Sequence, residues 1–210
     1  MNLILTYNIK HRAPSKNDAR ALEEAEFDSP ETIRGIKLAL ESLGHHVYLV
    51  EADERAYFKF KRLKESGKAG LVFNYAEGLR GADREAQIPA MLEMLGINYT
   101  GPTPLGYALG LNKTRTKEIL KLHKIPTPDW QVATSLSDNI TLAFPLIVKP
   151  ESEGSSKGIF AESLVRNKKQ LKKTLRRVIH NYHQPAIVEV FLPGREFAVG
   201  VVGTPPVVLP

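Results

Sequence analysis

A lysine and a glycine-serine loop lie close together in the stretch "LIVKPESEGSSKGI", residues 146–159. Lys149 ends a short apolar, β-branched run that predicts a strand, and Pro150 stops the strand there. Small residues follow that let backbone N–H groups and hydroxyls face a common point: Gly154, Ser155, Ser156 and Gly158. The pattern favours a phosphate site, with a solvated hairpin turn and a surface lysine as the alternative.

The two commonest nucleotide-binding loops do not account for this stretch. Neither GxxxxGK[ST] nor GxGxxG occurs anywhere in the chain. A phosphate site built here would combine the compact charge of Lys149 with many weaker donors from the loop.

The composition indicates a globular protein. The chain has 210 residues, 42% of them hydrophobic, and a formal net charge of +6. There is no apolar run of about 18 residues, and the first apolar run is too short for a secretory signal. The absence of cysteine excludes disulfides and thiolate metal sites. We therefore expect a cytoplasmic protein without a membrane segment.

Much of the positive charge lies in residues 166–182, "RNKKQLKKTLRRVIHNY". Its apolar residues recur at helical spacing and form one stripe: Leu171, Leu175, Val178, Ile179 and Tyr182. The lysines and arginines cover the other faces, which favours a solvated helix face over a nucleic-acid-binding surface. An RNA-binding domain remains the alternative, although no aromatic residues alternate with the charges.

The first half of the chain alternates strands with helices. We expect strands at 3–7, 45–52 and 70–75, with helices at 29–44 and near 54–66. Such a βαβαβ order predicts a parallel sheet in an α/β fold.

A charged loop, "AEGLRGADREAQIP", leaves the third strand at its carboxyl end. Ligands collect at this edge of open α/β sheets, so the loop is well placed for substrate contact through its charged residues: Glu77, Arg80, Asp83, Arg84 and Glu85. We take Asp83, Arg84 and Glu85 as the candidate substrate contacts. The alternative is an ordinary charged surface loop.

A second unit follows. We expect a fourth strand and a turn at 97–104. A helix follows within 112–130, with Lys113 near its start, and stops at the prolines, Pro126 and Pro128. Two strands, the basic helix and a last strand pair come next. We predict an N-terminal α/β domain over residues 1–112 and a central domain over 113–186. Residues 187–210 would form a linker and the first strands of a third domain.

Three segments occur in an order that resembles one family: "LEMLGINYTGPTPLGYALGLNKTRTKEIL", "FPLIVKPESEGSSKGI" and "IVEVFLPGREFAVGVVG". Together they cover roughly residues 70–203. The chain resembles the ATP-grasp ligases, most closely the D-alanine–D-alanine ligase group. This resemblance implies a parallel-sheet α/β domain followed by an ATP-grasp α+β central domain.

The resemblance also implies residue roles. Lys113 and Lys149 would contact the nucleotide phosphates, and the loop with Glu153, Ser155 and Ser156 would cover them. Lys149 and the two serines would act in catalysis. Adenosine contacts would come from the last matching segment: Glu189, Val190, Phe191, Leu192 and Glu196.

Glu189 and Glu196 are seven residues apart across a Pro-Gly turn, so they are expected on adjacent strands facing one cleft. Ordinary strand-surface carboxylates are the alternative interpretation.

The chain also departs from the family pattern. Where the family has a glycine-rich loop and Ser-x-Glu after the first strand, this chain has "NIKHRAPSKNDARALEEAEFD". Of the middle family motif it keeps Gly81, Asp83 and Gln87. Use of D-alanine is therefore not implied.

The family's magnesium ligands, an aspartate and a Glu-x-Asn pair, would lie beyond Pro210. We therefore expect no metal ligand in the chain and little activity from the chain alone.

The resemblance implies an ATP- and Mg²⁺-dependent carboxylate–amine ligase that works through an acyl phosphate. Its partners would be ATP and small amino-acid-like or peptide substrates, without nucleic acid or membrane, and a homodimer is the assembly it allows. A nucleotide-binding module without catalytic activity is the alternative.

Overall fold

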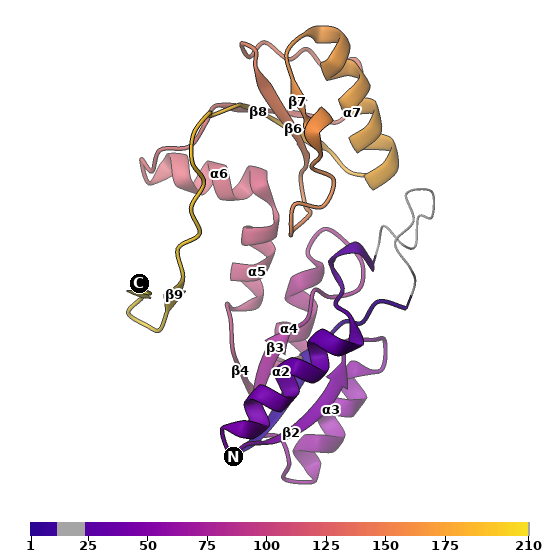
Figure 1. Cartoon of the computed structure of the whole chain (residues 1–210), viewed down its shortest axis with the longest axis vertical. Coiled ribbons are helices and arrows are strands. Elements are labelled where there is room, and N and C mark those ends of the chain that lie inside the picture. Colours follow the sequence, from indigo (N-terminus) through magenta and orange to yellow (C-terminus); the bar gives the residue numbers. More distant parts are fainter. Residues whose placement is uncertain (12–23, 210) are drawn as a thin grey trace.

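The computed structural model describes residues 1–11 and 24–209. Two α/β units follow one another along the long axis of the molecule (Figure 1). Helices α5 (Pro104–Leu111) and α6 (Lys113–Leu122) join them. None of the helices in the described part of the chain is long and apolar enough to cross a membrane.

The N-terminal unit is a parallel sheet with strand order β2-β1-β3-β4, which confirms the predicted α/β class. Its strands are β1 (Asn2–Tyr7), β2 (His46–Glu51), β3 (Leu71–Tyr75) and β4 (Asn98–Tyr99). Its helices are α2 (Pro30–Ser42), α3 (Ala56–Glu65) and α4 (Gln87–Met94), with short 3₁₀ turns η1 (Glu24–Glu26) and η2 (Arg84–Ala86).

Helices cover both faces of this sheet because successive strand residues point to opposite sides. Leu3 and Leu5 pack with Ile33 of α2 on one face. Ile4 packs with Phe60 of α3 and with α4 on the other. A strand buried on both faces must be apolar throughout, which is why "LIL" reads as a continuous run.

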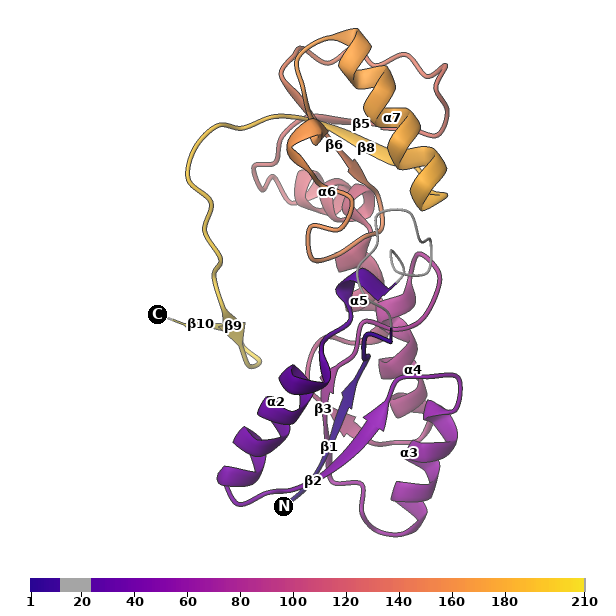
Figure 2. The same cartoon turned by 45° about the vertical axis from the view of Figure 1, so that its right-hand side comes forward.

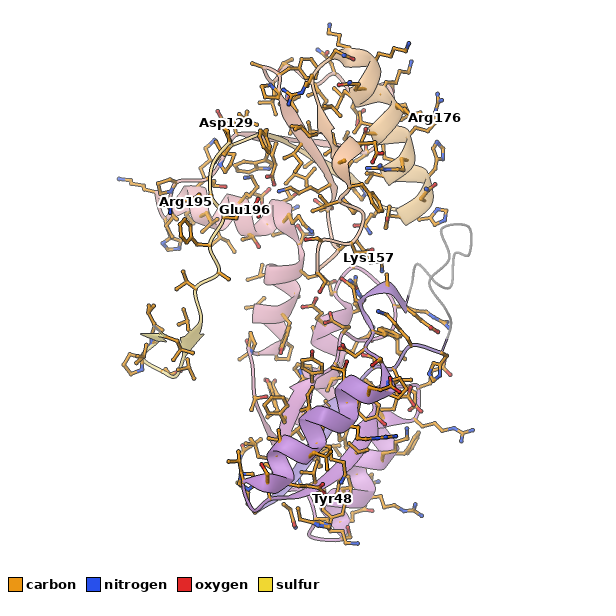
Figure 3. The ribbon with its side chains drawn as sticks, viewed as in Figure 1. Tyr48, Asp129, Lys157, Arg176, Arg195 and Glu196 are labelled. Atoms are coloured by element: carbon orange, nitrogen blue, oxygen red, sulfur yellow. The ribbon has the colours of Figure 1, made fainter. Side chains whose placement is uncertain are left out.

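The central unit is an antiparallel sheet with strand order β5-β8-β6-β7. Its elements are β5 (Trp130–Ala133), β6 (Leu146–Pro150), η3 (Ala161–Ser163), β7 (Leu164–Val165), α7 (Lys168–Tyr182) and β8 (Ala186–Val190). Leu171, Leu175 and Val178 of α7 are buried against the sheet, as their spacing predicted. Its lysines lie outside, as does Arg176 (Figure 3). Arg177 is half-buried and donates to Ser163 Oγ at 2.9 Å.

The segment before Lys113 is a helix that the sequence did not predict. Thr103 caps α5 by accepting a hydrogen bond from the Gly106 N–H, and a proline stands at the first helical position. Two glycines in "PLGYALGL" obscured this helix, because glycine lowers helix propensity. Helix α6 ends at Leu122, a few residues before the prolines at which the helix was expected to stop, Pro126 and Pro128.

Glu189 and Glu196 do not lie on adjacent strands, so that prediction is wrong. β8 pairs with β5 on one edge and β6 on the other, which leaves it no edge for a hairpin partner. Residues 191–200 form no strand and run away from the central unit (Figure 2). They lead to a small hairpin of β9 (Val201–Val202) and β10 (Val207–Val208).

Candidate active site

Three lysines gather around one carboxylate between α6 and the central sheet. Lys149 Nζ lies 2.9 Å from Glu189 Oε2, and Lys117 Nζ lies 3.8 Å from Glu189 Oε1. Lys113, one helical turn before Lys117, hydrogen-bonds the Glu151 and Glu153 carbonyls. We call Lys113, Lys117, Lys149 and Glu189 the lysine cluster.

Strand register places this cluster on the face of the sheet away from α7. In the antiparallel pairs, Ile147 lies opposite Glu189, and Trp130 lies opposite Glu189 on the other side. Opposed residues share a face, so Lys149 and Glu189 point away from the Val148 side that packs on α7. Helix α6 lies on the Glu189 side of the sheet and supplies Lys113 and Lys117.

The lysine cluster carries an excess of positive charge. Burial, and then the charge of Lys149, lower the pKa of Lys113 below its ordinary value. Burial also lowers the pKa of Lys117, which is 5% exposed, donates to Thr127 Oγ1 at 2.7 Å and lies over the Trp130 ring. Three cations against one carboxylate make a site that suits an anion.

The loop of residues 151–158 leaves β6 just after Lys149. Ser155 and Ser156 adopt left-handed backbone angles, with φ of 45° and 60°. Gly158 has φ of 81°, and a Cβ there would lie 2.4 Å from Pro150 Cγ, so only glycine fits. Both serine residues are exposed, and neither hydroxyl has a hydrogen-bond partner within the described ranges.

A cavity of about 240 Å³ adjoins this loop at the carboxyl end of β3. It is lined by Asn74, Tyr75, Ala76, Glu77, Glu85, Tyr107, Gly154 and Ser155. Burial, with Glu26 and Glu85 adding to it, raises the pKa of Glu77 to about 7. Burial also raises the pKa of Glu85. Of the three predicted substrate contacts, Glu85 lines this cavity, whereas Asp83 is exposed and does not.

Arg84 and Glu153 lie together in a buried ion-pair network. Arg84 Nη2 donates to Glu26 Oε2 at 2.5 Å and to Glu153 Oε2 at 3.0 Å. Lys157 Nζ lies 3.0 Å from Glu153 Oε2 and 3.8 Å from Glu26 Oε2. We call Glu26, Arg84, Glu153 and Lys157 the loop clamp. Figure 3 shows Lys157 where the two units meet.

The predicted adenosine segment is only partly open to a ligand. The Val190 N–H donates to the Asp129 carbonyl at 3.0 Å, and the Phe191 N–H donates to the Pro145 carbonyl at 3.1 Å. The Leu192 N–H bonds to no other group in the part of the chain the structure describes. Glu196 is exposed, and no hydrogen bond or ion pair joins it to the lysine cluster.

Four residues of these sites were missed from the sequence: Glu26, Tyr107, Lys117 and Lys157. Lys117 could have been found, because it lies four residues after Lys113 and so on the same helix face. Nothing in the sequence near Glu26 indicates that its carboxylate reaches the loop at Gly154, 128 positions away.

The relatives of this chain point to one family. Residues 107–209 match the family described as the D-Ala–D-Ala ligase C-terminus. An uncharacterized protein of Sinorhizobium fredii is 36% identical over 172 residues, 79% of this chain and 50% of that protein. The D-alanine–D-alanine ligase of Aquifex aeolicus is 34% identical over 177 residues, 82% of this chain and 57% of that protein.

The fold is shared with a solved enzyme. The crystal structure of D-alanine–D-alanine ligase from Bacillus anthracis complexed with ATP has a TM-score of 0.65 and 21% identity. The match covers 92% of this chain and 60% of that one. The chain spans about half the length of the curated relatives it matches. It belongs to the D-alanine–D-alanine ligase-like group of ATP-grasp proteins.

Proposed function

We propose that this chain forms the nucleotide-binding part of an ATP-dependent carboxylate–amine ligase. The observation that carries the proposal is the lysine cluster, where three partly buried cations face one carboxylate. A polyphosphate would supply the missing negative charge. Because the relatives of this chain are D-alanine–D-alanine ligases of the ATP-grasp type, we assign ATP as this polyphosphate.

Within this proposal, Lys113 and Lys149 bind the phosphates, and Lys117 joins them. The Leu192 N–H pairs with an adenine ring nitrogen, and Glu189 accepts a hydrogen bond from the adenine amino group. Glu196 binds the ribose hydroxyls once the segment after β8 folds back. The Val190 and Phe191 N–H groups already bond within the chain, so their residues contribute through carbonyls or side chains.

We place the amino-acid-like substrate in the cavity beside Ser155, where Glu77 and Glu85 would hold its ammonium group. A substrate carboxylate oxygen would attack the γ-phosphorus and break its bond to the β–γ bridging oxygen, which leaves ADP. The amine of a second substrate would attack the acyl carbon and form the C–N bond. The bond between the acyl carbon and the phosphate oxygen would break, phosphate would leave with its electron pair, and the amine would lose a proton. Ser155 and Ser156 would donate to the transferred phosphoryl group, with Lys149 supplying charge.

Magnesium would accompany ATP in such a reaction and neutralise part of its charge. Within the described ranges, no group of three or more His, Cys, Asp or Glu side chains could hold a metal ion. We therefore assign no metal ligand and derive no step through the ion. The proposed compartment is the cytoplasm, where ATP is available.

Calorimetric titration of the chain with ADP and ATP tests nucleotide binding. We expect saturable binding that Lys113→Ala and Lys149→Ala both weaken. Lys173→Ala, an exposed lysine of α7, is the control and should leave affinity unchanged. Equal affinities in all four proteins would contradict the proposal.

Phosphate release from ATP tests the ligase chemistry. It is measured with magnesium across a panel of D- and L-amino acids and short peptides, on this chain and on any longer protein that contains it. Substrate-dependent release supports the ligase. Binding of ATP with no release by any form favours the module without catalytic activity.

A further inference from the structure

We propose that Arg84 is a positioning residue, which with Glu26 holds the loop of residues 151–158 against the N-terminal unit. The loop would then be closed over the site before any ligand binds. The catalytic consequence of this closure rests on the proposed function. The closure itself follows from contacts within the chain.

The loop clamp joins the two units through buried charges. Glu26 and Arg84 come from η1 and η2 of the N-terminal unit, whereas Glu153 and Lys157 come from the loop. Their side chains are 2%, 8%, 9% and 10% exposed, respectively. Two cations and two carboxylates balance, so the clamp needs no ligand to neutralise it.

The clamp also holds the backbone of the loop. Arg84 Nη1 donates to the Ser152 carbonyl at 2.9 Å, and the Gly154 N–H donates to Glu26 Oε1 at 2.8 Å. A Cβ at position 154 would lie 3.0 Å from that carboxylate oxygen, so glycine allows the close approach. The Glu26 contact is thus one residue away from Ser155.

Gln184, just before β8, secures the same loop from the central unit. Its Nε2 donates to Glu153 Oε1 at 2.8 Å, and its Oε1 accepts from the Ser152 N–H at 2.6 Å. The loop is therefore fixed from both units at once. A shift of one unit against the other would move Ser155.

An arginine suits this role better than a lysine. The guanidinium of Arg84 reaches two carboxylates and one carbonyl from a rigid planar fork, whereas a lysine offers one flexible ammonium. Buried ion pairs add little net stability but strongly favour one arrangement of the groups around them. This is the behaviour expected of a positioning device.

Hydrogen exchange of the ligand-free chain tests the inference. The variants are Arg84→Lys, which keeps the charge, and Glu26→Gln, which keeps an acceptor for the Gly154 N–H. We expect the amides of residues 152–157 to exchange about tenfold faster or more in both variants, with a smaller change in the β1 and β8 amides. Arg115→Gln breaks an exposed ion pair with Glu118 and should change neither set.

Unchanged loop exchange in both variants would overturn the inference. An equal rise in loop and core amides would overturn it too, because Arg84 would then stabilise the fold without positioning the loop. The ADP titration is read separately: if the wild-type chain binds no nucleotide, the proposed function fails while the exchange result stands.

Discussion

The loop clamp and the lysine cluster both contact the loop after β6, and both are built from buried or half-buried charges. In the clamp, two cations meet two carboxylates. In the cluster, three cations meet one carboxylate. The clamp is neutral by itself, whereas the cluster is neutral only with an added anion.

This difference separates a structural role from a binding role. Burying charge is costly unless a partner compensates it, so a balanced network can persist without a ligand. An unbalanced one lowers the pKa of its own lysines, as burial and Lys149 do for Lys113. Perturbed groups of this kind mark candidate ligand sites.

The largest expected effect is on the clamp. Arg84→Met removes one cation and leaves two carboxylates sharing Lys157, so the free energy of unfolding should fall by about 3 kcal/mol. Urea denaturation measures it. Arg115→Met, in an exposed pair, should cost under about 1 kcal/mol. Similar losses in both variants would mean that the clamp is no stronger than a surface pair.

The next largest effect is expected on nucleotide binding by the lysine cluster. Lys149→Ala should weaken ADP and ATP binding by about 1–3 kcal/mol, the size of a lost charge-assisted hydrogen bond, and leave the fold intact. Titration calorimetry measures the affinity and circular dichroism the fold. An unchanged dissociation constant would show that the positive excess does not bind the nucleotide.

Glu77 lines the cavity near the clamp residues Glu26 and Arg84 and gives a pH test. Its folded pKa of about 7 exceeds the ordinary 4.5, so its stabilising contribution is complete below pH 4.5 and is lost as pH rises through 7. Glu77→Gln should match wild type near pH 4.5 and be more stable by about 1 kcal/mol at pH 8, once solvent screening is allowed for. Parallel stability profiles of the two proteins between these pH values would contradict the assignment.

The smallest effect is expected for the lysines of α7, which are exposed. Replacing Lys168, Lys169, Lys172 and Lys173 with glutamine should change ADP affinity less than about twofold. Wild type should bind RNA and DNA without a steep salt dependence. Fluorescence anisotropy at several salt concentrations measures this. Low-micromolar binding with a steep log–log slope would support the RNA-binding alternative.

Local patterns in the sequence predicted most elements because those elements depend on nearby residues. Ser29 accepts from the Thr32 N–H at the start of α2, and Pro30 stands at the first helical position, so the helix predicted at 29–44 begins where these residues cap it. Leu171, Leu175 and Val178 form the buried side of α7. Helix α5 was missed because its glycines lower the helix propensity of the segment. The helix forms nevertheless because it packs on η2 and α6.

The residues of the candidate site also divide into those found from local sequence patterns and those found only in the structure. Lys113, Lys149 and Ser155 were identified from the sequence because each belongs to a short motif of its own segment. Glu26 was not, because its role depends on a group far along the chain.

By itself, the sequence determined the α/β class, the basic surface of α7 and the segments that carry the candidate phosphate-binding groups, because each is encoded within about one element. Only the tertiary structure decided how the charges are paired. It placed Arg84 and Glu153 in a neutral clamp and added Lys117 to a cluster with excess positive charge. Pairing depends on which side chains the fold brings within a few ångströms, and sequence separation carries no information about that distance.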